Sequence, residues 1–172
     1  TSLGAFNSMQ ACLAFAGRPV DFCGVTVAIQ GLGATGYKLA KLIREAGGDV
    51  VATDVNPMAI KRAESNLGVR ILGDDEDLFT LPGVDILAPC ALGAVLDHRV
   101  ISELTASIVC GTANNVLAEP EADGQLIKDR GIIYAPDFIA NAGGVIHLAG
   151  LYSGLTPEEI DEKVAAIKPT TM

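Results

Sequence analysis

The chain has 172 residues, of which 49% are hydrophobic and 5% aromatic, and its formal net charge is −9. This length and composition suit one globular domain with a full core, while the negative charge opposes binding to nucleic-acid backbones. Because the sequence has neither an apolar run of membrane-helix length nor a secretory-type start, we expect a cytoplasmic protein with no nucleic-acid and no membrane partner.

Short apolar segments alternate along the chain with helical patterns. The chain opens on an amphipathic pattern that predicts a helix over Ser2–Gly17. The predicted strands are Val25–Gln30, Asp49–Thr53, Val69–Leu72, Asp85–Ala88, Ser107–Cys110 and Ile132–Tyr134. The predicted helices between and after them are Ala34–Ala46, Pro57–Leu67, Asp97–Leu104, Glu121–Arg130 and one that begins at Thr156-Pro157.

The alternation predicts an α/β fold with a doubly wound, mostly parallel sheet. Near-continuous apolar strands indicate burial on both faces, and intervening helices imply right-handed crossovers between parallel strands. We expect residues 1–172 to form a single domain. In this topology ligands bind at the carboxyl ends of the strands.

The segment Gly31-Leu-Gly-Ala-Thr-Gly36 has the spacing G-x-G-x-x-G between a predicted strand and a predicted helix. Gly31 allows a tight turn, Gly33 lets backbone amides approach a pyrophosphate, and Gly36 lets the helix pack closely on the strand. The positive end of the helix would stabilise the phosphate charge. This context predicts a Rossmann dinucleotide-binding domain.

Asp54 ends the second predicted strand, about 20 residues after the glycine loop, as that fingerprint requires. A carboxylate there can accept hydrogen bonds from the adenosine ribose hydroxyls and repels a 2′-phosphate, so it favours NAD over NADP. The alternative is that Asp54 caps the turn before Asn56-Pro57.

Other charged residues are interpreted as surface features. Lys38, Lys41 and Arg44 have the spacing of a solvated helix face, although they could be imagined on phosphate. The acidic run Asp74–Asp77 could form a carboxylate cluster, but it is better explained as a solvated helix start.

Four cysteines, at positions 12, 23, 90 and 110, lie far apart among apolar neighbours and lack CxxC spacing. We expect buried, reduced thiols. Since His98 and His147 are the two histidines, we expect no metal site.

Several segments together resemble one family. They are Thr1–Gly4, Gln30–Gly36, Ala88–Gly93, Gly111–Asn115 and Tyr134–Gly144. In this order they make the chain similar to the nucleotide-binding domain of the glutamate, leucine, phenylalanine and valine dehydrogenases. Asn114-Asn115 and Ile146-His147-Leu148 are more similar to the phenylalanine and leucine branch.

The resemblance implies an NAD-dependent oxidoreductase that oxidatively deaminates an L-amino acid to a 2-oxo acid and ammonia. No basic residue offers itself to a side-chain carboxylate, so we expect an apolar substrate. The alternatives are a regulatory module that binds NAD(H) without catalysis and a dehydrogenase of another small substrate.

The resemblance also implies the site residues. Thr1 would lie near the nicotinamide, Asn115 would hold its carboxamide end, and Asn141 would face the substrate. Val145 and Leu148 would line the substrate pocket, although such a pair is more often core. On pattern alone, Asn114 and Asn115 form a turn and Asn141–Gly144 separates two helices. The full cofactor set is Thr1, Gly31, Leu32, Gly33, Ala34, Thr35, Gly36, Asp54, Val55, Cys90, Ala91, Leu92, Ala113, Asn114, Asn115 and Asn141.

In the family the catalytic lysine lies in a glycine-rich stretch of a preceding domain, and an aspartate acts in proton transfer. The lysines at positions 38, 41, 61, 128, 163 and 168 are not in that setting. We therefore expect no catalytic residue in this chain and an N-terminal catalytic domain outside it. The full-length enzyme would be a homo-oligomer, and this chain alone a monomer or weak dimer.

Overall fold

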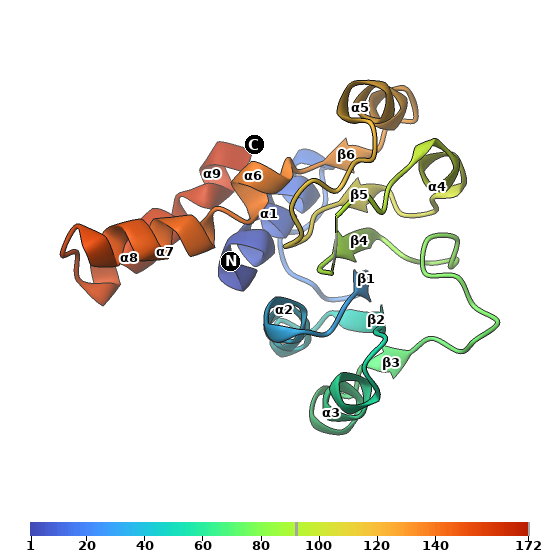
Figure 1. Cartoon of the computed structure of the whole chain (residues 1–172), viewed down its shortest axis with the longest axis horizontal. Coiled ribbons are helices and arrows are strands. Elements are labelled where there is room, and N and C mark those ends of the chain that lie inside the picture. The colour runs from blue at the N-terminus through green and yellow to red at the C-terminus, as the bar shows by residue number, and fades with distance from the viewer. Residues whose placement is uncertain (92, 172) are drawn as a thin grey trace.

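The computed structural model describes residues 1–91 and 93–171, which form a six-stranded parallel sheet covered by helices (Figure 1). The strands are β1 (Thr26–Gln30), β2 (Asp49–Thr53), β3 (Arg70–Ile71), β4 (Ile86–Pro89), β5 (Ile108–Val109) and β6 (Ile133–Tyr134). The helices are α1 (Ser2–Phe15), α2 (Ala34–Glu45), α3 (Pro57–Leu67), α4 (His98–Glu103), α5 (Pro120–Asp129), α6 (Asp137–Ala140), α7 (Gly143–Tyr152), α8 (Pro157–Ala165) and α9 (Ile167–Thr171).

The strand order is β3-β2-β1-β4-β5-β6, and every pair is parallel. The chain runs outward from β1 to β3 and then returns to the other side of β1 for β4 to β6. The direction of winding therefore reverses between β1 and β4, where a doubly wound sheet opens a crevice for ligands. The predicted α/β fold class is confirmed.

Two apolar layers, one on each face, bury the sheet. Along β1, Val27 and Ile29 join the layer covered by α1 and α2, and Ala28 joins the layer covered by α4 and α5. This alternation follows from the two-residue period of a strand. Packing of both layers holds the strands in place, and the candidate site lies at the carboxyl ends of these strands.

The link between β3 and β4 differs from the sequence expectation. Asp74–Asp77 do not begin a helix but lie in a loop. Glu76 accepts hydrogen bonds from the backbone N–H of Gly73, at 3.1 Å, and from Arg70. These bonds hold the acidic residues in a turn, because a carboxylate that binds local amides competes with helix formation.

Helix α1 is also not amphipathic as predicted. Its buried side includes Ser2, Gly4 and Ser8, while its less buried side carries the apolar Leu3 and Phe6, so polarity does not divide the helix into two faces. Helices α2, α6, α7, α8 and α9 each contact it. A Cβ at Gly4 would lie 2.8 Å from Ile167 Cδ1 and 2.9 Å from the carbonyl oxygen of Ala140. Small residues on α1 therefore allow these helices to approach closely.

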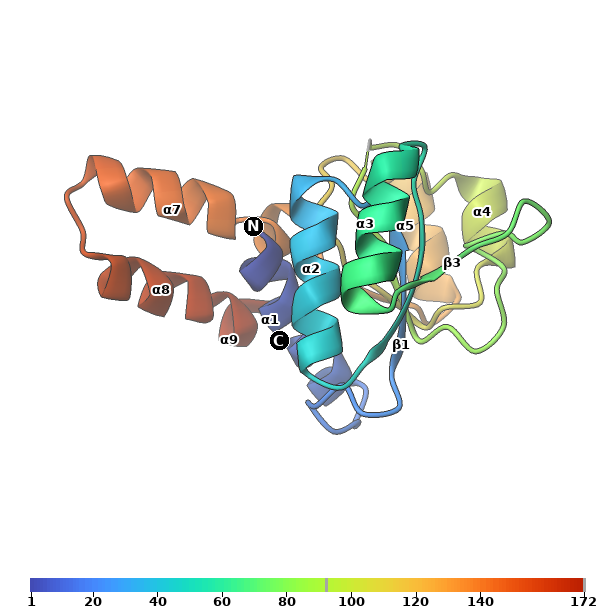
Figure 2. The same ribbon diagram turned by 90° about the horizontal axis from the view of Figure 1, so that it is seen from below.

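Helices α7 and α8 form a hairpin that projects from the sheet (Figures 1 and 2). Asn141 ends α6 and Ala142 precedes α7, so these two residues separate the helices, whereas Gly143 and Gly144 already belong to α7. Within the described residues, no helix is both long and apolar enough to cross a membrane.

Candidate functional site

The loops that follow β1, β2, β4 and β5 meet at the carboxyl edge of the sheet. A Cβ at Gly31 would lie 2.8 Å from the Cβ of Ala91, so the loops after β1 and β4 are in contact. Thr35 Oγ1 and Thr112 Oγ1 are 3.0 Å apart, which joins the loops after β1 and β5. The predicted site residues therefore come from separate segments but share one surface.

The three glycines of the first loop have different surroundings. A Cβ at Gly36 would lie 1.9 Å from the carbonyl oxygen of Gly31, so only glycine permits this approach of helix to strand. Gly31 has a φ of +96°, which favours glycine. At Gly33, in contrast, a Cβ would meet no atom within 4 Å, so this face of the loop is open.

Helix α2 begins at this open part of the loop, because Gly33 is its N-cap residue. Gly33 caps the helix without a side-chain hydrogen bond, and the first turn, which includes Ala34, carries no acidic residue. The partial positive charge of the helix end is thus available to an anion. Lys38 and Lys41 of α2 are exposed, as predicted.

Asp54 binds the backbone of two loops, the one after β1 and the one after β2. Its Oδ2 accepts from the N–H of Leu32 at 2.5 Å, and its Oδ1 accepts from the N–H of Asn56 at 2.7 Å. The turn-capping alternative is therefore present in the structure. Each oxygen keeps further acceptor capacity, so the same carboxylate can also receive hydroxyl groups. Val55, next to it, is fully exposed.

The loop after β5 presents two exposed asparagines. Asn115 has a φ of +51°, its N–H donates to Asp137 Oδ2, and its carbonyl accepts from Ala94 N at 2.6 Å. Asn114 and Asn115 lie outside helices and strands, as the turn interpretation predicts. The turn leaves both side-chain amides accessible at the sheet edge.

Asn141 lies against this loop. Its Nδ2 donates to Asn114 Oδ1 at 2.5 Å and to the carbonyl of Ala113 at 3.3 Å. A Cβ at Gly144 would lie 2.5 Å from Thr1 Oγ1, so the start of α7 is also close to the start of α1. The structure therefore brings the predicted amide-bearing residues together with Thr1 nearby.

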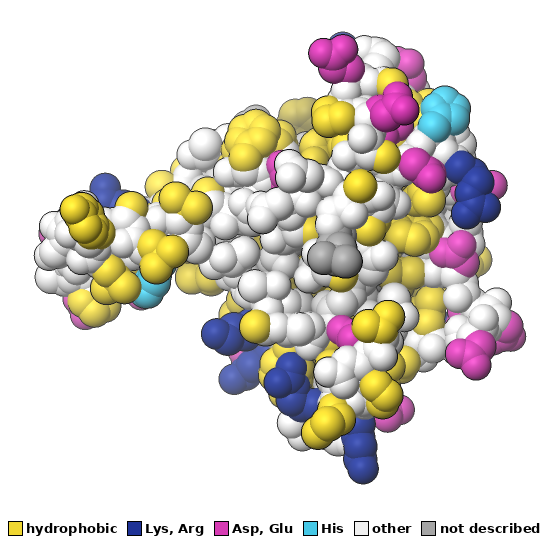
Figure 3. Space-filling view, in the orientation of Figure 1, with side chains coloured by type: hydrophobic (Ala, Val, Ile, Leu, Met, Phe, Trp, Pro, Cys, Tyr) yellow, Lys and Arg dark blue, Asp and Glu magenta, His cyan; other side chains and the backbone are white. Residues whose placement is uncertain are grey.

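Val145 and Leu148 stand on the exposed side of α7, where their exposed fractions are 71% and 69%. They are not core residues. With Leu151 and Tyr152 they form an exposed apolar face on the projecting hairpin, along which hydrophobic side chains gather (Figure 3). This face begins beside Asn141.

The cysteine expectation is partly wrong. Cys12 and Cys110 are buried and Cys90 is half-buried, but Cys23 is exposed, and all four thiols are free. Burial raises the pKa of Cys90, and the hydrogen bond with Cys12 followed by burial raises that of Cys110, so both stay protonated at neutral pH. Cys90 and Ala91 follow β4 at the site, whereas Leu92 lies outside the described residues.

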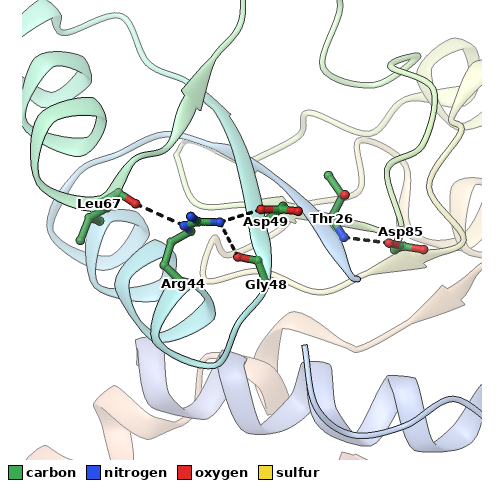
Figure 4. Close-up of polar contacts among 6 residues, drawn as sticks. All are labelled: Thr26, Arg44, Gly48, Asp49, Leu67 and Asp85. Carbon is green, nitrogen blue, oxygen red and sulfur yellow. Dashed lines mark hydrogen bonds and ion pairs between the residues drawn. The ribbon is translucent and has the colours of Figure 1, made fainter. Parts of the chain in front are cut away.

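Arg44 is not part of a solvated face. Its guanidinium donates to the carbonyls of Leu67 and Gly48, at 3.2 and 2.8 Å, and pairs with Asp49 at 2.7 Å (Figure 4). It therefore ties the end of α2 to the start of β2 and the end of α3. The helical spacing of the basic residues predicted a solvated Arg44, because spacing along one helix does not include carbonyls supplied by other segments.

Two residues near the loop were not singled out from the sequence. Arg62 donates to the carbonyl of Leu32 at 3.2 Å. Gln30 Oε1 is buried without a hydrogen-bond partner among the described residues, beside a polar hollow of about 460 Å³ between Thr53 and Phe79. A polar side chain at the end of an apolar strand was the available signal for Gln30.

Comparison with known proteins agrees with the resemblance. The family model described as glutamate/leucine/phenylalanine/valine dehydrogenase matches residues 53–167. The chain belongs to this family. It is 39% identical to a valine dehydrogenase of Streptomyces virginiae over all of this chain and 48% of that protein. It is 37% identical to a leucine dehydrogenase of Bacillus subtilis (strain 168) over 97% of this chain and 45% of that protein.

Solved structures of the family share the fold. An L-tryptophan dehydrogenase from Nostoc punctiforme has a TM-score of 0.93 and 34% identity over 98% of this chain and 51% of that one. A hetero-hexameric glutamate dehydrogenase from Thermus thermophilus has a TM-score of 0.75 and 25% identity over 99% of this chain and 44% of that one. The chain spans about half the length of the family members that it matches.

Proposed function

We propose that this chain is the NAD-binding domain of an amino-acid dehydrogenase that oxidatively deaminates an apolar L-amino acid to a 2-oxo acid and ammonia. The observation that carries the proposal is the combination of an open Gly33 face, an α2 N-terminus without a side-chain cap, and Asp54, which follows β2 and binds the N–H of Leu32 in the glycine loop. Membership of the dehydrogenase family supports the reaction class.

The residues of the loop after β1 fit a dinucleotide. The space beside Gly33, which a Cβ would fill, suits a diphosphate held by the first amides of α2, around Ala34 and Thr35. Asp54 would accept the adenosine ribose hydroxyls, with Leu32 and Val55 next to it, and this carboxylate favours NAD over NADP. When bound, NAD supplies the hydride acceptor.

The amide cluster fits the other end of the cofactor. The side chains of Asn114, Asn115 and Asn141 would offer both donors and acceptors to a carboxamide, next to Ala113, whose carbonyl accepts from Asn141. Asn141 would hold the substrate near Thr1, and the bond from Asn141 to Asn114 couples substrate contact to cofactor contact.

The exposed face of α7 supports an apolar substrate. Val145 and Leu148 provide a hydrophobic surface beside Asn141, and α7 contains no acidic or basic residue other than His147. Such a surface stabilises an aliphatic or aromatic side chain and offers no partner to a carboxylate. We propose that the catalytic lysine and aspartate come from outside residues 1–172 and close over this face.

Calorimetric titration with NAD, NADH and NADP tests the proposal. We expect the chain to bind NAD and NADH, to bind NADP more weakly, and to lose most NAD affinity in Asp54→Ala, because two ribose hydrogen bonds to a charged group are lost. Lys128→Ala, a surface change on α5, is the matched control. We expect no turnover of L-valine, L-leucine or L-phenylalanine by the chain alone. Failure of the wild-type chain to bind any dinucleotide would contradict the proposal, and turnover by the chain alone would contradict the placement of the catalytic residues.

A further inference from the structure

Arg62 of α3 reaches across to the glycine loop. Its Nη2 donates to the carbonyl of Leu32 at 3.2 Å, and its guanidinium carbon lies 3.9 Å from the centre of the Tyr37 ring on α2. Stacking on an aromatic ring restricts the planar guanidinium to one orientation. The charge is therefore held at a defined position beside the loop rather than moving freely in solvent.

Leu32 joins Arg62 to Asp54. The N–H of Leu32 binds Asp54 Oδ2 at 2.5 Å, while its carbonyl binds Arg62. Since the nitrogen and oxygen of one residue are about 3 Å apart, Arg62 Nη2 and Asp54 Oδ2 lie within about 9 Å of each other. A positive and a negative group thus border the same short stretch of the loop.

The positive charge of Arg62 is not neutralised by this neighbour. Both oxygens of Asp54 accept from backbone N–H groups, of Leu32 and Asn56. Within residues 1–91 and 93–171, no carboxylate forms an ion pair with Arg62. Lys and Arg side chains gather over α2 and α3 (Figure 3), although the chain as a whole has a charge of −9.

We propose that Arg62 is a specificity-determining residue of the dinucleotide site: its guanidinium attracts a phosphate at the adenosine 2′ position, in opposition to Asp54. The inference rests on the proposed function, which places the adenosine ribose at Asp54. Asp54 favours the 2′-hydroxyl of NAD and repels the 2′-phosphate of NADP, whereas Arg62 carries the donors that bind phosphate. The preference for NAD is therefore a balance between two side chains.

This balance has a specific consequence for substitution of Asp54. Asp54→Asn retains an oxygen for the N–H of Leu32 but removes the negative charge. The charge of Arg62 is then unopposed, so this single change makes NADP a ligand. Without Arg62, the same change only weakens NAD.

Titration of NAD and NADP against five proteins tests the inference: wild type, Asp54→Asn, Arg62→Gln, the double variant and Asp54→Asn combined with Arg62→Lys. We expect Asp54→Asn to bind NADP at least about tenfold more tightly than wild type, as one charge-assisted hydrogen bond predicts. Adding Arg62→Gln removes this gain while changing NAD affinity much less. Adding Arg62→Lys retains part of the gain, because the charge remains, and NADP binding then weakens as salt is raised.

Lys128→Gln in the Asp54→Asn background controls for net charge, since Lys128 lies on α5 at the opposite edge of the sheet. Far-ultraviolet circular dichroism and urea unfolding verify that each variant is folded. If Arg62→Gln lowers the affinity for NAD and NADP equally, Arg62 only positions the loop and the inference is overturned. If Asp54→Asn binds NADP no more tightly than wild type, the inference is also overturned, while the proposed function stands. Failure of wild type to bind NAD removes the proposed function and the inference together.

Discussion

Helices α2 and α7 both carry apolar residues three positions apart, but these residues have opposite surroundings. Leu39 of α2 is fully buried between the sheet and α1, whereas Leu148 of α7 is 69% exposed on the projecting hairpin. Helix α2 has a layer to pack against, and the outer face of α7 has none among the described residues. Apolar periodicity therefore predicts a helix face that needs a partner, but it does not identify where the partner comes from.

The buried region around the glycine loop and the exposed face of α7 have different roles. The glycine-loop region, from β1 to α3, is packed against other elements of this same chain, such as α1. The face of α7 instead exposes Val145 and Leu148, which do not contribute to the core of this chain. Under the proposed function these side chains act on a substrate rather than on the fold, and the two regions should respond differently to the same substitution.

We expect the largest change in the free energy of unfolding at the buried Leu39 of α2. Leu39→Ala should lower the free energy of unfolding by about 3 kcal/mol, because it removes a fully buried side chain and leaves a cavity. Leu148→Ala should change it by less than about 0.5 kcal/mol, because the side chain is exposed. Urea unfolding of both variants measures the contrast. Equal losses would mean that the hairpin contributes to the core of this chain.

The next effect separates two glycines of one loop. Gly36→Ala should destabilise the chain by about 2 kcal/mol, since the new Cβ would meet the carbonyl of Gly31. Gly33→Ala should cost less than about 1 kcal/mol, because its Cβ faces open space and only the helix cap changes. Gly33→Ala should nevertheless abolish NAD binding in calorimetry. Full NAD affinity in Gly33→Ala would show that the diphosphate lies elsewhere.

Sequence patterns predict well those parts of the fold that local chemistry determines. Pro57–Leu67 was predicted to the residue, because Asn56 caps the helix, Pro57 starts it and Gly68 ends it in a left-handed conformation. Helices α6 and α9, with four and five residues, are too short to show a period. The loop between β3 and β4 was mistaken for a helix start because the bonds of Glu76 depend on Arg70 and Gly73 in their folded positions.

The candidate site shows the same limit. The glycine loop and Asp54 could be predicted because strand, loop and acid follow one another along the chain. The bond from Arg62 to Leu32 spans 30 residues and depends on α3 lying beside α2. Arg44 was misinterpreted for the same reason, because its acceptor at Leu67 is supplied by the end of α3.

Arg44 gives an intermediate effect within the stable region. Arg44→Ala should lower the free energy of unfolding by about 1–2 kcal/mol, because the carbonyls of Leu67 and Gly48 lose a charged donor. Lys41→Ala is the matched control on the same helix. Its contact with Glu45, at 3.7 Å, is exposed and should contribute less than about 0.5 kcal/mol. If Lys41→Ala lowered the free energy of unfolding as much as Arg44→Ala, the hydrogen bonds of Arg44 would not be the cause of its effect.

The smallest effect concerns the loop between β3 and β4, which is ordered by polar contacts rather than by burial. The hydrogen bond from Gly73 N–H, and then the contact with Arg70, lower the pKa of Glu76 below its usual 4.5. A lowered pKa in the folded state stabilises the fold above the unfolded value, and this contribution is lost as the pH falls below 4.5 through the folded value.

Glu76→Gln should therefore reduce the fall in the free energy of unfolding between pH 6 and pH 3. Urea unfolding at several pH values measures this fall. Asp75→Asn is the control for the loss of one loop carboxylate. Because Glu76 is only partly buried in a surface loop, we expect a change in slope rather than a large loss of stability. An identical slope in wild type and Glu76→Gln would show that the turn is held without its carboxylate. The order of this loop would then depend on its apolar residues, Leu78 and Phe79, which pack into the layer beneath α4 and α5.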